Sequence, residues 1–216
     1  MKIISHRGYW KQPQEKNTPK AFERSFALGF GTETDIRDAH GQLVISHDMP
    51  HGNEISFSRM LDMAADHSSS ATPITLALNI KADGLAGMVA TEIAARPSLD
   101  CFVFDMAVPD MRSYISAGVP VFTRMSEVES SPAWLELAHG VWLDAFTAPW
   151  YSHEEIEKLL SKLRVCVVSN ELHKRDHLSH WEWLKPLARH SNLLLCTDFP
   201  EDAEIFFNTH GMEYEA

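Results

Sequence analysis

A chain of 216 residues is long enough for one sizeable core, and its 44% hydrophobic and 23% charged residues exclude an intrinsically disordered protein. The formal net charge of −11 argues against a nucleic-acid or anionic-membrane surface, because such surfaces need clustered Lys and Arg. The length also lies near the lower limit, about 200 residues, of a single α/β barrel. We therefore expect one domain over residues 1–216.

The start of the chain, MKIISHRG, lacks the apolar core of a signal peptide, and no apolar run approaches the roughly 18 residues of a membrane span. Cys101, Cys166 and Cys196 each lie inside an apolar run, which favours buried free thiols over a disulfide framework. These features predict a cytoplasmic protein without a transmembrane segment. The oligomeric state stays open.

Short β-rich runs alternate with helical patterns, which is typical of a parallel sheet with crossover helices. We expect strands over residues 2–5, 32–36, 43–46, 74–81, 101–105, 120–123, 140–144, 164–169 and 192–197. We expect helices from residue 18 and over 56–66, 85–95, 109–117, 133–138, 152–162 and 178–189, and a last helix from residue 200. Because 43–46 follows a His40-Gly41 turn, it is expected to return as a paired strand. The other eight strands predict a TIM-type (β/α)8 barrel.

Residue patterns inside these elements predict which side chains face the core. The first helix can be capped by Asn17 or Thr18 and carries Phe22, Phe26 and Leu28 on its apolar side. In the strand over 74–81, the even-numbered residues are apolar and are expected to face the helices. Asn79 and Lys81 then face the barrel interior.

Polar residues gather where the first strands end. His6 and Arg7 end the first strand, Glu33 and Asp35 point to one face of the second, and His47 ends the return strand. An α/β barrel places its site at the carboxyl ends of its strands, so these side chains are expected to meet. Two converging carboxylates would suit a hard cation such as Mg²⁺ or Ca²⁺.

Five sequence segments resemble the glycerophosphodiester phosphodiesterase family. They are ISHRGYW (4–10), KNTPKAF (16–22) and TETDIRDAHGQLVISHD (32–48), followed by TLALNIKA (75–82) and CTDFPEDA (196–203) as weaker matches. A His-Arg-Gly, an Asn-Thr, a Glu-x-Asp and a His-Asp in this order make the first three specific. The resemblance implies a barrel that acts on a small-molecule phosphodiester.

The residues and the resemblance together assign expected roles for hydrolysis. One divalent cation, Mg²⁺ or Ca²⁺, would be held by Glu33, Asp35 and Asn79. His6 and His47 would be the general acid and base, since imidazole titrates near neutral pH. The substrate's phosphate would be bound by Arg7 and Lys81. In the family, the nucleophile implied is a neighbouring hydroxyl of the substrate, which gives a cyclic phosphate that water then opens.

The chain departs from the family pattern at two positions. Lys16 precedes Asn17 where the family has Glu, and Asn79 stands where the family has a third carboxylate. Because Asn is neutral, the site carries one negative charge fewer and should hold metal more weakly. Two alternatives therefore stay open: a non-catalytic barrel that binds a phosphorylated ligand or partner, and a lyase of the same superfamily that releases a cyclic phosphate.

Several other polar and aromatic residues have two possible roles. Asp105 and Asp198 can face the site or stabilise loops. His173, His177 and His180 favour a solvated helix entry over a metal site. For Trp142, Phe146 and Trp150 we expect packing rather than contact with substrate.

Overall fold

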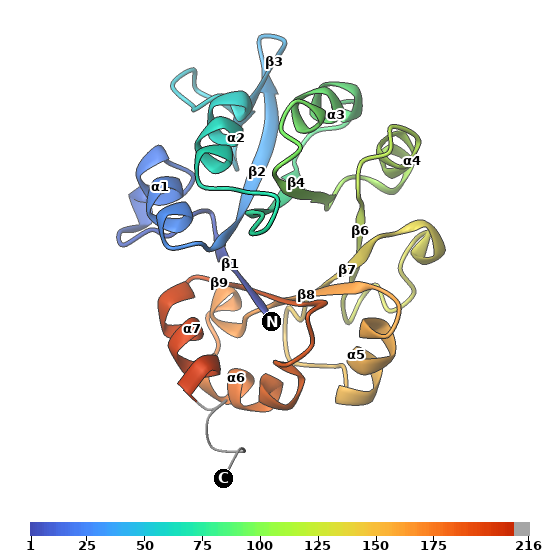
Figure 1. Cartoon of the computed structure of the whole chain (residues 1–216). Coiled ribbons are helices and arrows are strands. Elements are labelled where there is room, and N and C mark those ends of the chain that lie inside the picture. Colours follow the sequence, from blue (N-terminus) through green and yellow to red (C-terminus); the bar gives the residue numbers. More distant parts are fainter. Residues whose placement is uncertain (210–216) are drawn as a thin grey trace.

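The computed structural model describes residues 1–209, and its strands form one sheet that curls into a barrel (Figure 1). The strands are β1 (Lys2–His6), β2 (Gly31–Ala39), β3 (Gln42–Ile45), β4 (Thr75–Ile80), β5 (Asp100–Phe104), β6 (Phe122–Met125), β7 (Gly140–Leu143), β8 (Arg164–Val168) and β9 (Leu193–Thr197). Eight parallel strands follow the order β5-β4-β2-β1-β9-β8-β7-β6, and β3 pairs antiparallel with β2. A bridge between Val103 and Val121 joins the two ends of this order. The predicted TIM-type barrel with a paired strand is confirmed.

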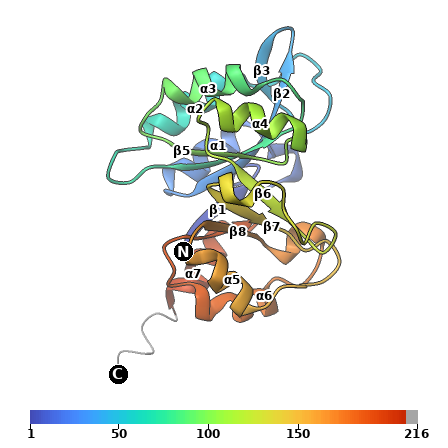
Figure 2. The same cartoon turned by 90° about the vertical axis from the view of Figure 1, so that its right-hand side faces the viewer.

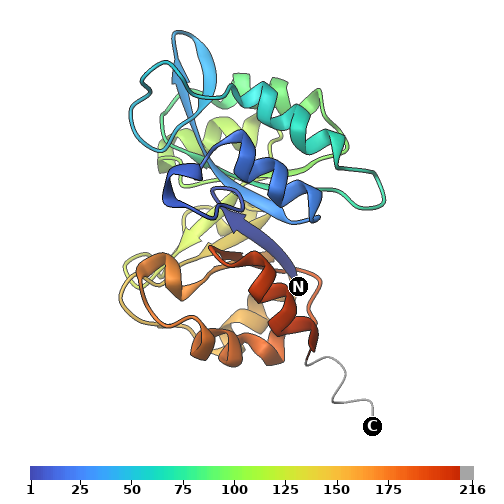
Figure 3. The ribbon, with the colours of Figure 1, turned by 90° about the vertical axis from the view of Figure 1, so that its left-hand side faces the viewer.

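Helices surround this sheet. They are α1 (Pro19–Ala27), α2 (Phe57–Asp66), α3 (Ala86–Ala94), α4 (Val108–Ser116), α5 (His153–Leu160), α6 (Leu178–Leu184) and α7 (Pro200–Thr209). Short 3-10 helices are η1 (Pro13–Glu15), η2 (Leu135–Leu137), η3 (Asn170–His173) and η4 (Lys185–Leu187). Figure 3 shows β1 between α1 and α7, where the first and last parts of the chain meet. Among residues 1–209, none of the helices has the length and apolarity needed to cross a membrane.

The crossover between β6 and β7 lacks the helix predicted over 133–138 and contains only η2. Pro132 and the left-handed backbone of Trp134 (φ 49°) leave too few residues before β7 for a longer helix.

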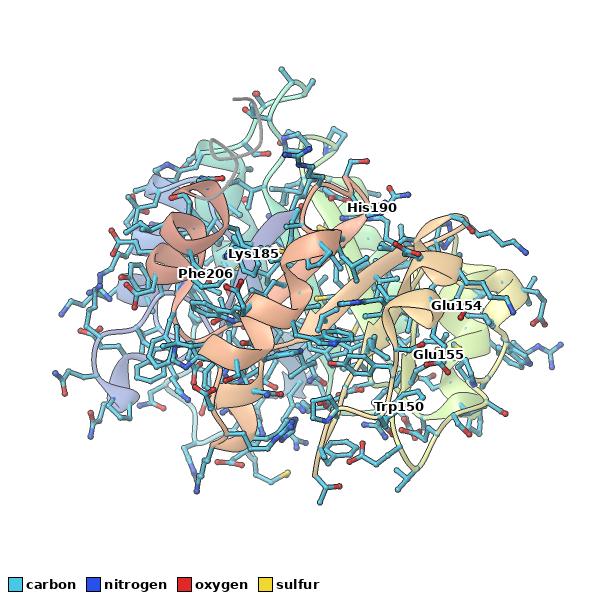
Figure 4. The ribbon with its side chains drawn as sticks, turned by 90° about the horizontal axis from the view of Figure 1, so that it is seen from below. Trp150, Glu154, Glu155, Lys185, His190 and Phe206 are labelled. Carbon is cyan, nitrogen blue, oxygen red and sulfur yellow. The ribbon has the colours of Figure 1, made fainter. Side chains whose placement is uncertain are left out.

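Trp150 and Glu155 line an apolar pocket beside η2 (Figure 4). On the same side of the molecule, Lys185 Nζ lies 5.2 Å from the centre of the Phe206 ring.

The ends of α1 and α5 differ in how they are capped. Thr18 is the N-cap residue of α1 but its side chain does not cap the helix, and Leu28 is 47% exposed, so its predicted burial is wrong. Leu28 lies beyond the last turn of α1, as its C-cap residue. At α5, Ser152 and Glu155 form the reciprocal hydrogen bonds of a capping box.

Aromatic side chains fill one half of the barrel interior. Phe102 stacks on Phe122 with ring centres 3.7 Å apart, and Phe104 stacks on Trp142 at 3.8 Å. They come from β5, β6 and β7; Figure 2 shows β6 and β7 between α4 and the helices of the C-terminal half. Smaller buried residues, including Ala77 and the free thiols of Cys166 and Cys196, occupy the interior as well. The expected packing role of Trp142 and the free, buried cysteines are confirmed.

Candidate active site at the carboxyl ends of the strands

The register of β1, β2 and β4 brings the predicted polar residues to one end of the barrel. His6 pairs with Glu33, and Asp35 pairs with Asn79. Glu33 and Asp35 are buried on the interior face of β2, while Thr32 on the opposite face hydrogen-bonds to Ser25 of α1. The strand phase predicted from the sequence is therefore correct.

Asp35 is surrounded by the two cations that the sequence predicted for phosphate binding. Arg7 Nε lies 3.1 Å from Asp35 Oδ2, and Lys81 Nζ lies 3.4 Å from Asp35 Oδ1. Asn17 donates a hydrogen bond from Nδ2 to Asp35 Oδ2 at 2.8 Å. Arg7 has a left-handed backbone (φ 58°) at the end of β1. Both cations are mostly buried but keep some exposure at the barrel mouth, where an anion can reach them.

His6 forms a pair with Asp198, which follows β9. Nδ1 of His6 lies 2.7 Å from Asp198 Oδ1, and Nε2 lies 3.9 Å from Glu33 Oε2. Because an ionised carboxylate only accepts hydrogen bonds, Nδ1 is the donor and Nε2 of neutral imidazole carries a free lone pair. Burial lowers the pKa of His6 despite the opposing effect of Asp198. Burial raises the pKa of Asp198, but the hydrogen bond and charge of His6 bring it below its ordinary value. Burial therefore favours a neutral imidazole available as a base, and Asp198 orients it.

Three oxygen atoms at this site are buried and receive no hydrogen bond. They are Glu33 Oε2, Asp35 Oδ1 and Asn79 Oδ1, one from each predicted metal ligand. Burial and then the charge of Asp35 raise the pKa of Glu33 well above its ordinary value. Residues 1–209 contain no group of three or more His, Cys, Asp and Glu residues that could hold a metal, so a cation bound here would need the Asn79 amide as its third ligand. Carboxylate and amide oxygens that accept no hydrogen bond would fit a hard cation, which at Asp35 Oδ1 would share the oxygen with the ammonium group of Lys81.

His47 lies on the rim of the barrel mouth. Ser46 N hydrogen-bonds to Asp35 O, so His47 follows directly beside the strand that carries Asp35. Its side chain is 43% exposed and its Nδ1 lies 2.9 Å from Asp48 Oδ1. The hydrogen bonds of His47 within residues 1–209 lead to Asp48 and Arg37 rather than to the other predicted site residues. The structure thus gathers His6, Arg7, Glu33, Asp35, Asn79 and Lys81, with His47 at their border.

Some neighbours of these residues were not identified from the sequence. Asn17, expected as a helix cap, instead binds Asp35, and its left-handed backbone (φ 57°) allows this direction. Trp10 donates to Asp198 at 3.3 Å, and Lys16 Nζ lies 4.0 Å from Asp198 and 4.4 Å from the Trp10 ring centre. The Asn-Thr of the family-like motif and the strand-end position of Asp198 were the signals for these contacts.

The opposite side of the barrel mouth has a second set of charged residues. Asp105 lies 3.3 Å from Arg124 and accepts a hydrogen bond from Asn79, whereas Asp144 pairs with His173 at 2.7 Å. His180 is buried and bonds to Tyr151, so the predicted solvated helix entry is wrong for this histidine, whereas His173 and His177 are partly exposed. The helical periodicity of that segment did not reveal that η3 folds back onto the strand ends.

Comparison with solved structures reveals the same fold in known enzymes. A glycerophosphodiester phosphodiesterase from Agrobacterium tumefaciens is 17% identical, with a TM-score of 0.67 over 97% of this chain and 99% of the other. A glycerophosphoryl diester phosphodiesterase from Parabacteroides distasonis is 15% identical, with a TM-score of 0.64 over 97% and 86%. A chain of the tryptophan synthase complex from Pyrococcus furiosus, 13% identical over 96% and 94%, has a TM-score of 0.55. No family model and no curated protein sequence matches the chain.

Proposed function

We propose that this chain is a metal-dependent phosphodiesterase that hydrolyses glycerophosphodiester-like substrates. The observation that supports this proposal best is the set of three buried oxygens without donors, from Glu33, Asp35 and Asn79, beside two cations and an imidazole–carboxylate pair. The fold shared with two phosphodiesterases agrees with this chemistry. The order of the sequence segments that resemble the same family supports it independently.

Each requirement of phosphodiester cleavage has a candidate at the barrel mouth. A divalent cation held by Glu33, Asp35 and Asn79 would neutralise charge on the phosphoryl oxygens. Arg7 and Lys81 bind the phosphate from the side of Asp35, with the planar guanidinium suited to two phosphoryl oxygens. Binding the phosphate there orients its phosphorus for attack.

The two histidines move the protons in this mechanism. His6 accepts the proton of the attacking hydroxyl at Nε2, while Asp198 holds the ring through Nδ1 and stabilises the imidazolium that forms. His47, at the exposed rim, protonates the leaving alkoxide. When the hydroxyl belongs to the substrate, a cyclic phosphate forms first and water opens it in the reverse sequence of proton transfers.

Activity is tested by incubating the protein with a panel of glycerophosphodiesters in Mg²⁺, Ca²⁺ or a chelator. We expect metal-dependent release of a phosphomonoester. Accumulation of a cyclic phosphate would instead identify the lyase alternative, because that reaction ends at the ring. A folded protein that binds these diesters without cleaving any of them would favour the non-catalytic alternative.

Glu33→Gln is expected to raise the melting temperature above that of the wild type without metal, and to lose this advantage when metal is added. Without metal, the raised pKa of Glu33 means that the native state keeps a proton which the unfolded state loses above about pH 4.3. The stability of the wild type therefore falls as pH rises from about 4.3 towards the raised pKa of Glu33. At pH 8 in chelator, Glu33→Gln should melt at a higher temperature than the wild type. Millimolar Mn²⁺ should raise the wild-type Tm by about 5 °C or more and that of the variant much less.

Glu136→Gln provides the matched control, since Glu136 is exposed and lies on the crossover between β6 and β7. Its melting temperature should follow the wild type in both conditions. If Mn²⁺ does not change the melting temperature of the wild type, this result would contradict the metal site, whatever the activity of the protein.

A further inference from the structure

Asn79 leaves the predicted metal site one negative charge short, and the structure contains a carboxylate that can make up for it. Asn79 pairs with Phe104 across β4 and β5, and Asp105 is the next residue after Phe104. Asp105 has a left-handed backbone (φ 62°), which Asp tolerates better than most residues. This turn ends β5 and allows the Asp105 side chain to reach the end of β4.

The contacts of Asp105 determine how the Asn79 amide is oriented. Arg124 Nη1 lies 3.3 Å from Asp105 Oδ1, and Asn79 donates from Nδ2 to Asp105 Oδ2 at 3.3 Å. A carboxylate paired with a guanidinium offers only acceptors, so it can take the amide NH₂ of Asn79 but not its oxygen. The oxygen of the planar amide therefore points away from Asp105. That atom, Asn79 Oδ1, is buried without a donor, as are Glu33 Oε2 and Asp35 Oδ1.

We propose that Asp105 is a positioning residue for the metal site. It fixes the Asn79 amide with its oxygen toward the cation, and it supplies from the neighbouring strand the negative charge that a carboxylate at position 79 would have carried. Arg124 holds Asp105 in place from the other side. This inference rests on the proposed function, because it concerns the same cation.

The arrangement makes positions 79 and 105 interdependent. A carboxylate at position 79 would face the carboxylate of Asp105 across a distance that a hydrogen bond now spans, and like charges there repel. Exchanging the two residue types restores one carboxylate and one amide. Asn79→Asp alone should therefore melt lower in chelator than the swapped Asn79→Asp/Asp105→Asn protein.

Mn²⁺ affinity provides a test that does not depend on turnover. Electron paramagnetic resonance of free Mn²⁺ measures Kd for the wild type, Asp105→Ala, Asp105→Asn and the swapped protein. Loss of an outer-shell partner typically weakens metal binding about 10-fold or more, which is the result expected for Asp105→Ala. The swapped protein should bind Mn²⁺ within about 3-fold of the wild type, because the charge and the ligand oxygen are both present.

Asp144→Asn is the matched control, since it removes a carboxylate from the same barrel mouth whose partner is His173 rather than Asn79. Its Kd should stay within about 2-fold of the wild type, the small change that a more distant charge produces. Asp105→Asn keeps the shape of the side chain and serves if Asp105→Ala folds poorly. The wild type could bind Mn²⁺ while Asp105→Ala and Asp105→Asn bind it as tightly as Asp144→Asn does. This result would overturn the role of Asp105 alone. No Mn²⁺ binding by the wild type would overturn the proposed metal site as well.

Discussion

His6→Ala is expected to lower kcat for glycerophosphodiester hydrolysis by about 10³-fold, which is a typical contribution of a general acid or base. The imidazole is held by Asp198 through Nδ1, and its Nε2 lies beside the predicted metal ligand Glu33. Removing the ring takes away the proton acceptor and leaves the carboxylate of Asp198 without its partner. Steady-state release of the phosphomonoester measures the effect.

His190→Ala is the control for this experiment, because His190 is an exposed histidine between η4 and the start of β9, at the opposite end of the strands from the candidate site (Figure 4). It should keep wild-type kcat. Asp198→Asn should fall between the two, since it retains the imidazole but weakens its orientation and the stabilisation of its charged form. Equal turnover of His6→Ala and His190→Ala would remove His6 from the mechanism.

Gly140→Ala is expected to destabilise the protein by about 2–3 kcal/mol, the upper part of the usual range for overpacking a filled core. A Cβ atom at position 140 would lie less than 3 Å from three atoms of the Phe122 ring. That ring cannot move away freely, because it is fully buried and stacks on Phe102 at 3.7 Å. Chemical denaturation measures the loss as a lower midpoint with an unchanged m value.

Gly87→Ala is the matched control, since Gly87 lies in α3 and an added Cβ there meets no atom within 4 Å. Alanine forms helices better than glycine, so this substitution should stabilise the protein by about 0.5–1 kcal/mol. Phe122→Leu should restore part of the stability lost in Gly140→Ala by providing space for the added methyl. A Gly140→Ala protein as stable as the wild type would show that the aromatic layer adapts, contrary to close packing.

The effect at Gly140 could not be predicted from the sequence. Glycine at a strand start is common, and nothing in the local pattern indicates an aromatic ring from β6 against its backbone. Likewise, the predicted strand over 120–123 begins two residues later, at Phe122. Strand limits depend on hydrogen bonds from neighbouring strands, which local propensity does not encode.

The sequence by itself determined the barrel class and the half of the site carried by β1, β2 and β4. Alternation of period two fixes which side chains point inward, so the residue pattern alone assigns one face to Glu33, Asp35, Asn79 and Lys81. The motif order added His6 and Arg7 to that set. These are local properties of the chain or of neighbouring strands.

Only the tertiary structure decided which partners complete those residues. Asp198 lies 192 positions from His6 in the chain, and Asp105 lies 26 positions from Asn79, yet each pair is within hydrogen-bonding distance. Barrel closure brings the last strand beside the first, and left-handed turns at Asn17 and Asp105 give their side chains directions that no strand or helix period predicts. Contacts of this kind depend on the packed geometry of the whole barrel, because they join elements whose sequences carry no signal of each other.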